Sequence, residues 1–394
     1  MSIKKNAFLI SLLLVTSQLF SQITLSEKAE ILVLTLGPTQ TELYSAFGHS
    51  AIRVYDPKNN INRIYNYGVF DFNQPNFYLN FARGFLNYKL DTVDYPRFRY
   101  AYIYYNRFIH EQVLNFTLQE KQQFFDFLEW NMLPENQYYY YDYFFDNCAT
   151  RVRDALEKAF PNQIEFNGDY IQSNLTIREL TDLYLGYQPW GDLGIDLCLG
   201  LPIDVEPTAY MHMFLPDYIE SAFNNATFTR NGEKKSLVKK TISTYESKPD
   251  QVGEKSLFRP NVVFWLVFVV FMSISFYQFR TKKSYNWIDA VFFSLIGLLG
   301  TLLLILWVAT DHKAAASNMN ILWAIPTHLI AGILLIRNSK PSWLPKYFLL
   351  TSLFMLMVVV FWKLLPQMIH YSLMPIVISL GLRGFMIWKT SKHN

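Results

Sequence analysis

The C-terminal third of the chain consists of long apolar runs separated by short polar loops. Five such runs can be delimited, at residues 261–279, 287–308, 321–336, 347–362 and 369–388. Each is close to the roughly 20 residues that a helix needs to cross the hydrocarbon core of a bilayer. The pattern therefore predicts an all-α transmembrane domain of five helices within residues 260–394.

Earlier in the chain the apolar pattern is that of a mixed α+β domain. In "HSAIRVYD" the residues alternate, so that Ile52 and Val54 fall on one face of a strand and His49 and Arg53 on the other. The turn-forming stretch "DPKNN" separates this segment from a second strand-like run, "RIYNYGVFDF". We therefore expect a β-hairpin over these residues.

Two segments in the middle of the chain have helical periodicity. Residues 117–133 repeat apolar positions at helical spacing, with Thr117 at the expected N-cap and Glu120 three residues later. Residues 146–160 form a second expected helix, capped by Asp146 or Asn147. Together with the hairpin they predict one globular domain over residues 22–229, whereas the polar residues 230–259 are expected to be a linker.

The first residues have the form of a cleaved signal peptide. Lys4 and Lys5 precede an apolar run over residues 7–14, and small and polar residues follow up to Ser21. Residues 1–21 are therefore expected to direct the following domain out of the cytoplasm.

Charged loops predict the orientation in the membrane. Basic residues gather after the first, third and fifth apolar runs: Arg280, Lys282, Lys283, Arg337, Lys340, Lys346, Lys389 and Lys392. Positively charged loops stay in the cytoplasm. We therefore expect a multi-pass protein of the inner membrane, with its N-terminal domain in the periplasm and its C-terminus in the cytoplasm.

Composition narrows the range of functions. The chain is 51% hydrophobic and 17% aromatic with a formal net charge of +3, so no basic field indicates a nucleic-acid partner. The sequence contains no HExxH motif, no clustered His and Cys, and no phosphate-binding glycine loop. Neither a metal nor a cofactor is expected.

Cys148 lies in the first turn of the second expected helix, where chemistry favours a reactive thiol. The free N–H groups and the positive end of the helix dipole there stabilise a thiolate, which is the nucleophilic form. Two structural alternatives stay open, because the only other cysteine, Cys198, is available for a disulfide and a lone cysteine is often a small buried residue.

A thiol nucleophile needs a base, and His49 is the best candidate. The expected exported domain has two other histidines, His110 and His212, whose surroundings suit ordinary, partly buried residues. His49 lies on the strand face opposite Ile52 and Val54, so that it can face a groove if those two residues pack in the core.

Several motifs together resemble one family. The stretches "FGHSAIRV", "YNYGVFDF", "YYYYDYFFDNCATRVRDAL" and "WGDLGIDLCLGLPID", followed by membrane spans, look like the Lnb family, the lipoprotein N-acyltransferases of Bacteroidota. This resemblance implies a periplasmic domain with a papain-like fold of the permuted NlpC type. It also implies a cysteine-dependent acyltransferase that moves a fatty acyl group from a membrane phospholipid to the α-amino group of a diacylated lipoprotein.

The resemblance implies roles for particular residues. Cys148 would be the acyl-accepting nucleophile and His49 its base, and supporting candidates are Arg53, Tyr67, Asp71, Asn147 and Arg151. On the membrane side the candidates are His312, Asn318 and Asn320. Two alternatives remain: a membrane-tethered cysteine peptidase or amidase of the cell wall, and a ligand-binding domain without enzyme activity.

Overall fold

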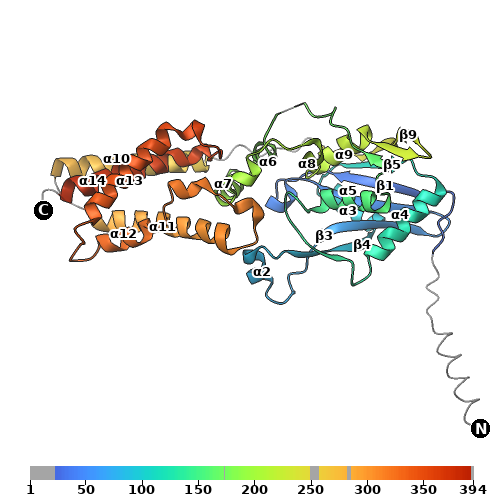
Figure 1. The fold of residues 1–394 in the computed structure, drawn as a ribbon, viewed down its shortest axis with the longest axis horizontal. Helices are drawn as coiled ribbons and strands as arrows, with labels where there is room; N and C mark the ends of the chain where they lie inside the picture. Colours follow the sequence, from blue (N-terminus) through green and yellow to red (C-terminus); the bar gives the residue numbers. More distant parts are fainter. Residues whose placement is uncertain (1–22, 173, 249–256, 282–284, 392–394) are drawn as a thin grey trace, which may run out of the picture.

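The computed structural model describes residues 23–172, 174–248, 257–281 and 285–391. The predicted signal peptide, residues 1–21, lies outside the described residues. The molecule is elongated, with a mixed α/β domain at one end and a bundle of apolar helices at the other (Figure 1).

A seven-stranded antiparallel sheet forms the centre of the N-terminal domain. Its strands, in spatial order, are β10 (Val238–Tyr245), β5 (Ile109–Leu114), β1 (Glu30–Leu36), β2 (His49–Asp56), β3 (Ile61–Val69), β4 (Asn87–Asp94) and β6 (Tyr138–Tyr140). A smaller sheet contains β7 (Ile164–Glu165), β8 (Thr227–Arg230) and β9 (Glu233–Ser236).

Helices cover both faces of the main sheet. The helices described between Phe77 and Asn225 are, in chain order, α2 (Phe77–Arg83), α3 (Tyr95–Tyr104), α4 (Leu118–Asn131), α5 (Cys148–Ala159), α6 (Ile177–Asp182), α7 (Pro189–Cys198), α8 (Ala209–His212) and α9 (Pro216–Asn225). Helices α4, α5 and α9 pack on the face that contains Ile52 and Val54, whereas α3 packs on the face that contains Ala51 and Ile64.

The predicted local elements are present. The antiparallel register of β2 and β3 confirms the hairpin. Helix α4 begins after Thr117, whose side chain and Glu120 form the expected capping box. Helix α5 begins after Asn147, which resolves the choice of cap. The antiparallel sheet with helices confirms a mixed domain, and its papain-like relationship remains a prediction.

The predicted linker, residues 230–259, begins too early. Strand β9 and strand β10 lie within it, and β10 pairs with β5 at the edge of the main sheet. Lys239 and Lys240 are exposed on this edge strand, so the segment is polar even though its backbone is paired. The sheet of the N-terminal domain therefore extends to Tyr245.

The C-terminal domain has helices at each predicted position, but they differ in length. They are α10 (Pro260–Thr281), α11 (Asn286–Ala309), α12 (His328–Leu335), α13 (Leu344–Val360) and α14 (Met374–Ser391). Within the described residues, α10, α11 and the segment Tyr371–Ser391 are long and apolar enough to cross a membrane, and α13 is a shorter apolar helix.

The third predicted span, 321–336, is not a full-length helix. Helix α12 has 8 residues, which extend about 12 Å against a hydrocarbon core of about 30 Å. Before it, the chain forms the 3-10 turn Met319–Leu322 and passes through Pro326, which cannot donate a helical hydrogen bond. Gly297, midway along α11, allows the backbone of Leu329 to approach closely, so α12 begins beside the middle of α11.

Candidate active site

Cys148 is the first residue of α5, as the sequence predicted. The Asn147 side chain accepts hydrogen bonds from the N–H groups of Ala149 and Thr150, at 2.9 and 3.0 Å. The Asn147 amide nitrogen in turn donates to the carbonyl oxygen of Phe214 at 2.8 Å. This cap fixes the start of the helix and therefore the position of the sulfur.

His49 is the first residue of β2, and its imidazole lies near enough to the Cys148 thiol for each group to shift the pKa of the other. Gly48, immediately before it, has φ +78°, and a Cβ atom there would lie 2.7 Å from the Leu36 carbonyl oxygen. Only glycine fits this position without strain. The "FGHS" motif therefore contains the backbone turn that places the imidazole beside the thiol.

Asn66 is the third member of the site, and the sequence analysis missed it. Its Oδ1 atom lies 2.5 Å from His49 Nε2. Nε2 is thus the nitrogen that carries the proton donated to Asn66, which leaves Nδ1 to exchange a proton with Cys148. The three side chains form a Cys–His–Asn arrangement in which the amide orients the imidazole.

The electrostatics favour an ion pair between Cys148 and His49. Burial alone would raise the pKa of the Cys148 thiol, but the charge and hydrogen bond of His49 and the N–H groups of Ser50 and Ala149 hold it below its usual 9.0. Burial would likewise lower the pKa of His49, whereas Cys148 and Asn66 raise it above 6.5. Each partner therefore stabilises the charged form of the other.

Gly68 lies beside Cys148. This residue has φ +86° at an irregularity between β3 and β4, and a Cβ atom there would contact Cys148 Cβ at 3.6 Å and Tyr139 Oη at 3.9 Å. Tyr139 is 8% exposed, and its hydroxyl has no hydrogen-bond partner among the described residues. Burial keeps the pKa of Tyr139 well above 10, so this hydroxyl is a hydrogen-bond donor beside the thiol.

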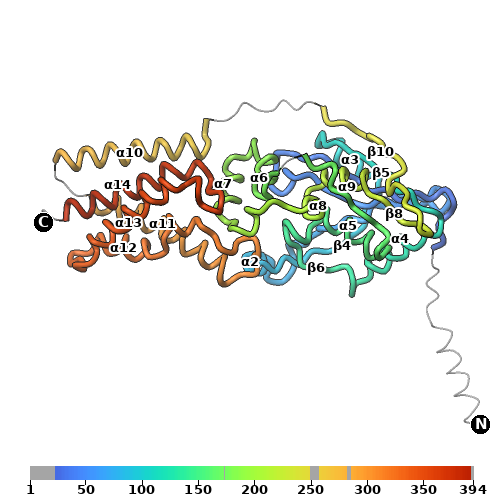
Figure 2. Tube along the Cα trace, turned by 45° about the horizontal axis from the view of Figure 1, so that its top comes forward, coloured from blue at the N-terminus to red at the C-terminus, as the bar shows by residue number. Residues whose placement is uncertain are grey.

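The site lies at the end of the sheet that faces the helical domain. Strands β1 and β3 end there, β2 and β4 begin there, and α5 begins there with Cys148. Helices α2 and α7, at the same end, lie next to α11 in both views (Figures 1 and 2). Cys148, the first residue of α5, is thus at the end of the sheet nearer to the apolar helices.

Comparison with known families identifies both parts of the chain. Residues 19–182 match the Lnb N-terminal periplasmic domain, and residues 252–394 match the Lnb transmembrane domain. The chain belongs to the Lnb family. A comparison with curated proteins and one with solved structures each gave no match.

Three of the supporting residues expected in this Lnb site have other partners in the structure. Arg53 forms an ion pair with Glu111 at 2.9 Å, and it is four residues along β2 from His49, a distance of about 13 Å. Tyr67 points to the sheet face opposite His49, donates to Asn131 Oδ1 at 2.7 Å and packs edge-on against the Tyr139 ring. Asp71 is exposed beyond the end of β3. Alternation along β3 explains the position of Tyr67, which falls on the face opposite His49. Arg53 shares the face of His49 but lies further along β2, and Asp71 lies beyond the end of β3.

Arg151, the remaining supporting candidate, contacts the site through Tyr139. Its guanidinium forms an ion pair with Asp146 and stacks over the Tyr139 ring, with its Cζ 3.9 Å from the ring centroid. We interpret it as a residue that positions Tyr139.

Neither cysteine forms a disulfide, which excludes the Cys148–Cys198 bond considered from the sequence. Cys198 is exposed at the end of α7. The other histidines of the periplasmic domain are also accounted for. His110 contacts Glu220 at 3.0 Å, and His212 is fully buried with Nδ1 3.0 Å from the Thr208 carbonyl oxygen.

The membrane-side candidates join the two Lnb domains. His312 Nε2 lies 3.0 Å from the Phe81 carbonyl oxygen of α2. Asn318 donates to the Leu197 carbonyl oxygen at 2.8 Å, and Asn320 donates to that of Asp196 at 3.0 Å. Both asparagines are buried, so they fix α7 to the transmembrane domain and are not free to bind a substrate.

Among the described residues, three carboxylates next to this junction are grouped as the ligands of a metal ion would be. One oxygen each from Asp182, Asp192 and Asp196 lie within 4.8 Å of one another. Arg178 donates to Asp196 at 2.6 Å, so a positive charge is already present. Burial and the charges of Asp196 and Asp192 raise the pKa of Asp182 to about 8, so that at neutral pH a proton is shared within this group.

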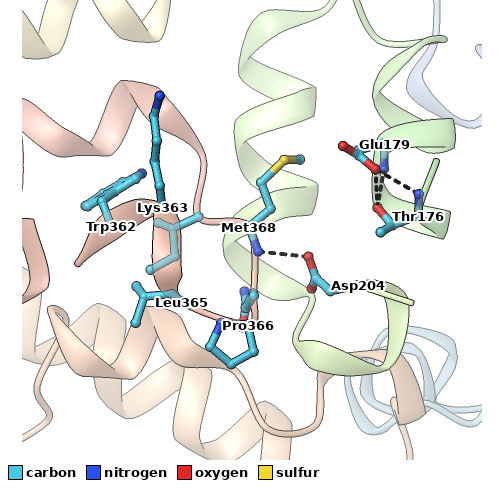
Figure 3. A pocket seen from close by; sticks show the side chains of 10 residues that line it. Thr176, Glu179, Asp204, Trp362, Lys363, Leu365, Pro366 and Met368 are labelled. Atoms are coloured by element: carbon cyan, nitrogen blue, oxygen red, sulfur yellow. Dashed lines mark hydrogen bonds between the residues drawn. The ribbon is translucent and has the colours of Figure 1, made fainter. Parts of the chain in front are cut away.

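A hollow of about 400 Å³ opens between the two domains (Figure 3). It is lined by Thr176, Glu179 and Asp204 from the periplasmic domain and by residues 362, 363 and 365–369 from the transmembrane domain. The backbone N–H of Met368 donates to Asp204 across it at 2.9 Å. Its lining includes neither Cys148 nor His49, so it is separate from the candidate site around these two residues.

Proposed function

We propose that this protein is a lipoprotein N-acyltransferase that uses Cys148 as its nucleophile. The observation that supports this most strongly is the Cys148–His49–Asn66 arrangement at the membrane-facing end of the sheet, in a chain whose second domain is transmembrane. The donor is a membrane phospholipid, and the acceptor is the α-amino group of a diacylglyceryl-modified cysteine.

The first step forms a thioester. The Cys148 thiolate attacks an ester carbonyl carbon of the phospholipid, and the negative charge develops on the carbonyl oxygen. The Cys148 N–H, which has no acceptor within the first turn of a helix, and the Tyr139 hydroxyl are the donors we assign to this oxygen. The ester C–O bond then breaks, and protonated His49 gives its proton to the departing lysophospholipid.

The second step transfers the acyl group to nitrogen. The neutral α-amino group attacks the thioester carbonyl carbon, and His49 accepts a proton from that amine. The C–S bond breaks, which releases the amide product and restores the thiolate. An α-amino pKa of about 7.7–8.0 leaves enough neutral amine at pH 7 for this attack.

The proposal includes an orientation of the protein in the membrane. We place it in the inner membrane with the C-terminus in the cytoplasm. Arg280, Arg337 and Lys389 lie at the ends of helices that are remote from the periplasmic domain, which agrees with the rule for positive loops (Figure 1).

The test is to trap the thioester with the full-length protein in phospholipid vesicles. A phospholipid with a labelled acyl chain should label the wild-type protein in a hydroxylamine-sensitive way, and a diacylglyceryl-cysteine peptide should then remove the label. Cys148→Ala should form no thioester, and His49→Ala should react at least about 10³-fold more slowly. Tyr139→Phe should slow thioester formation, because it lacks one donor to the oxyanion.

Cys198→Ala is the matched control and should retain wild-type labelling. N-acylated product from Cys148→Ala would contradict the proposal. Cleavage of cell-wall peptides by the wild-type protein in the absence of lipid, without acyl transfer, would favour the peptidase.

A further inference from the structure

The connection between β3 and β4, residues 70–86, projects from the periplasmic domain and contains α2. We call this segment the aromatic arm. Its large apolar side chains face outward: Phe72 is 61% exposed, Tyr78 77%, Leu79 57% and Phe81 41%. No residue of α2 is buried. A contiguous apolar surface of this kind on a short projecting helix indicates a binding surface.

The arm is attached to the outer end of the transmembrane domain. The backbone N–H of Asp311, two residues beyond α11, donates to the Arg83 carbonyl oxygen at 2.8 Å. Gly84 has φ +86°, and a Cβ atom there would lie 2.8 Å from the backbone of Asp311 and His312. The close approach therefore requires glycine. It holds α2 at the level where α11 leaves the membrane.

The exposed surface of α11 continues to this level. Trp307 is 40% exposed and Val308 67% exposed, three or four residues before the contact with the arm. Tryptophan is typical of the boundary between acyl chains and headgroups. The apolar surface of the arm is thus a continuation of a surface that already faces lipid.

The inner side of the arm leads to the nucleophile through contacts between aromatic rings. The centroids of Phe77 and Phe70 are 6.2 Å apart, those of Phe70 and Tyr88 5.1 Å, and those of Tyr88 and Tyr141 4.5 Å. Tyr141, like Cys148, lies next to Gly68. An apolar chain that enters along the arm therefore remains in aromatic surroundings as far as the sulfur.

We propose that the aromatic arm inserts into the outer leaflet of the membrane and that its partner is the acyl chains of phospholipids. Tyr78, Leu79 and Phe81 enter the boundary between headgroups and chains, as amphipathic interfacial helices do. Arg83, also exposed, lies in the last turn of α2, where its charge suits lipid phosphates. Insertion stands on the geometry alone, whereas delivery of a phospholipid ester to Cys148 rests on the proposed function.

The insertion is tested in full-length protein reconstituted in nanodiscs. In a Cys148→Ser, Cys198→Ser background, Leu79→Cys is labelled with the fluorophore NBD, and the nanodiscs contain either ordinary or brominated phosphatidylcholine. We expect brominated lipid to quench the label at position 79. Leu118→Cys is the matched control, because Leu118 is an exposed leucine at the start of α4, beyond the end of β5 that points away from the membrane. It should show no quenching.

A second measurement tests the arm in active protein. Tyr78→Asp combined with Leu79→Asp should slow thioester formation from vesicle phospholipid but leave the alkylation rate of Cys148 by iodoacetamide unchanged. Leu118→Asp should change neither rate. If thioester never forms in the wild type while quenching at 79 is observed, the proposed function fails and insertion stands.

Equal emission at position 79 in both kinds of nanodisc would overturn the insertion. Protection of that label only after addition of a lipoprotein would assign the surface to a protein partner instead. Gly84→Ala gives an independent check, because loss of the contact with Asp311 should reduce quenching at position 79 without changing it at 118.

Discussion

The start of α5 and the end of α7 form a natural comparison, because each holds one of the two cysteines of the chain. Cys148 is at the N-terminal end of its helix and Cys198 at the C-terminal end. Backbone N–H groups and His49 lower the pKa of Cys148, whereas partial loss of hydration raises the pKa of Cys198 above 9.0. The pKa values of the two thiols are thus shifted in opposite directions, for reasons that lie in the residues around each sulfur.

The most direct test of this difference is to measure the reactivity of the two thiols against pH. At pH 7 a thiol with a pKa above 9.0 is under about 1% thiolate, so we expect Cys148 to be alkylated about 10²-fold faster than Cys198. Because its pKa is lowered, the Cys148 profile should rise at lower pH than that of an ordinary thiol. Mass spectrometry of iodoacetamide-treated protein, peptide by peptide, measures both profiles.

Replacement of His49 separates the causes of the difference. In His49→Ala the Cys148 profile should move to higher pH, because the positive imidazolium is lost, whereas the Cys198 profile should stay in place. Coincident profiles for the two thiols in the wild-type protein would show that the site does not activate Cys148.

Replacing Asn66 tests the role of the imidazole separately, since Asn66 contacts His49 and not the sulfur. Asn66→Ala should reduce the rate of acyl transfer about tenfold or more, because His49 loses the acceptor that fixes its tautomer. Helix α5 and its cap remain, so part of the thiol activation should persist. The measurement is the rate of acyl transfer together with the alkylation profile of Cys148. Asn62→Ala, four residues earlier on β3, is the control, and an equal loss of rate in both variants would exclude a specific role.

Much of this site was predictable from local sequence. The cap before Cys148 and the alternation around His49 are short-range patterns, and both hold in the structure. Asn66 was missed, although the register of the predicted hairpin places it near His49. Continuing the register Ile52–Tyr65 places Asn66 opposite Ala51, on the same sheet face as His49 and diagonal to it. The candidate Tyr67 lies one residue further and therefore faces the other way.

Longer-range features were less accessible to sequence reasoning. Strand β10 reads as a linker because an edge strand can be polar on its exposed side and still pair through its backbone with β5. The apolar run at 321–336 does not reveal that its first part is held by Asn320 and the turn before Pro326. In both cases the segment contacts residues that are distant in the chain, and these contacts cannot be predicted from the pattern of the segment itself.

The last prediction concerns the region around α7, where the pKa of a carboxyl group is shifted. The folded-state pKa of Asp182 is about 8, compared with its usual 3.8. The folded protein therefore binds this proton more tightly than the unfolded chain, and stability should fall as pH rises from about 4 to about 8. Asp182→Asn cannot ionise, so it should unfold at a higher temperature than the wild type at pH 8.5 and at a similar temperature at pH 4.

Thermal unfolding of full-length protein in detergent, followed by intrinsic fluorescence, measures the difference. One unit of pKa shift corresponds to about 1.4 kcal/mol, and we expect at least this stabilisation at pH 8.5. Asp169→Asn, at an exposed position of the same domain, is the control and should follow the wild-type curve at both pH values. Parallel curves for wild type and Asp182→Asn would mean that Arg178 alone balances the carboxylates beside α7, and that the junction between the domains holds no shared proton.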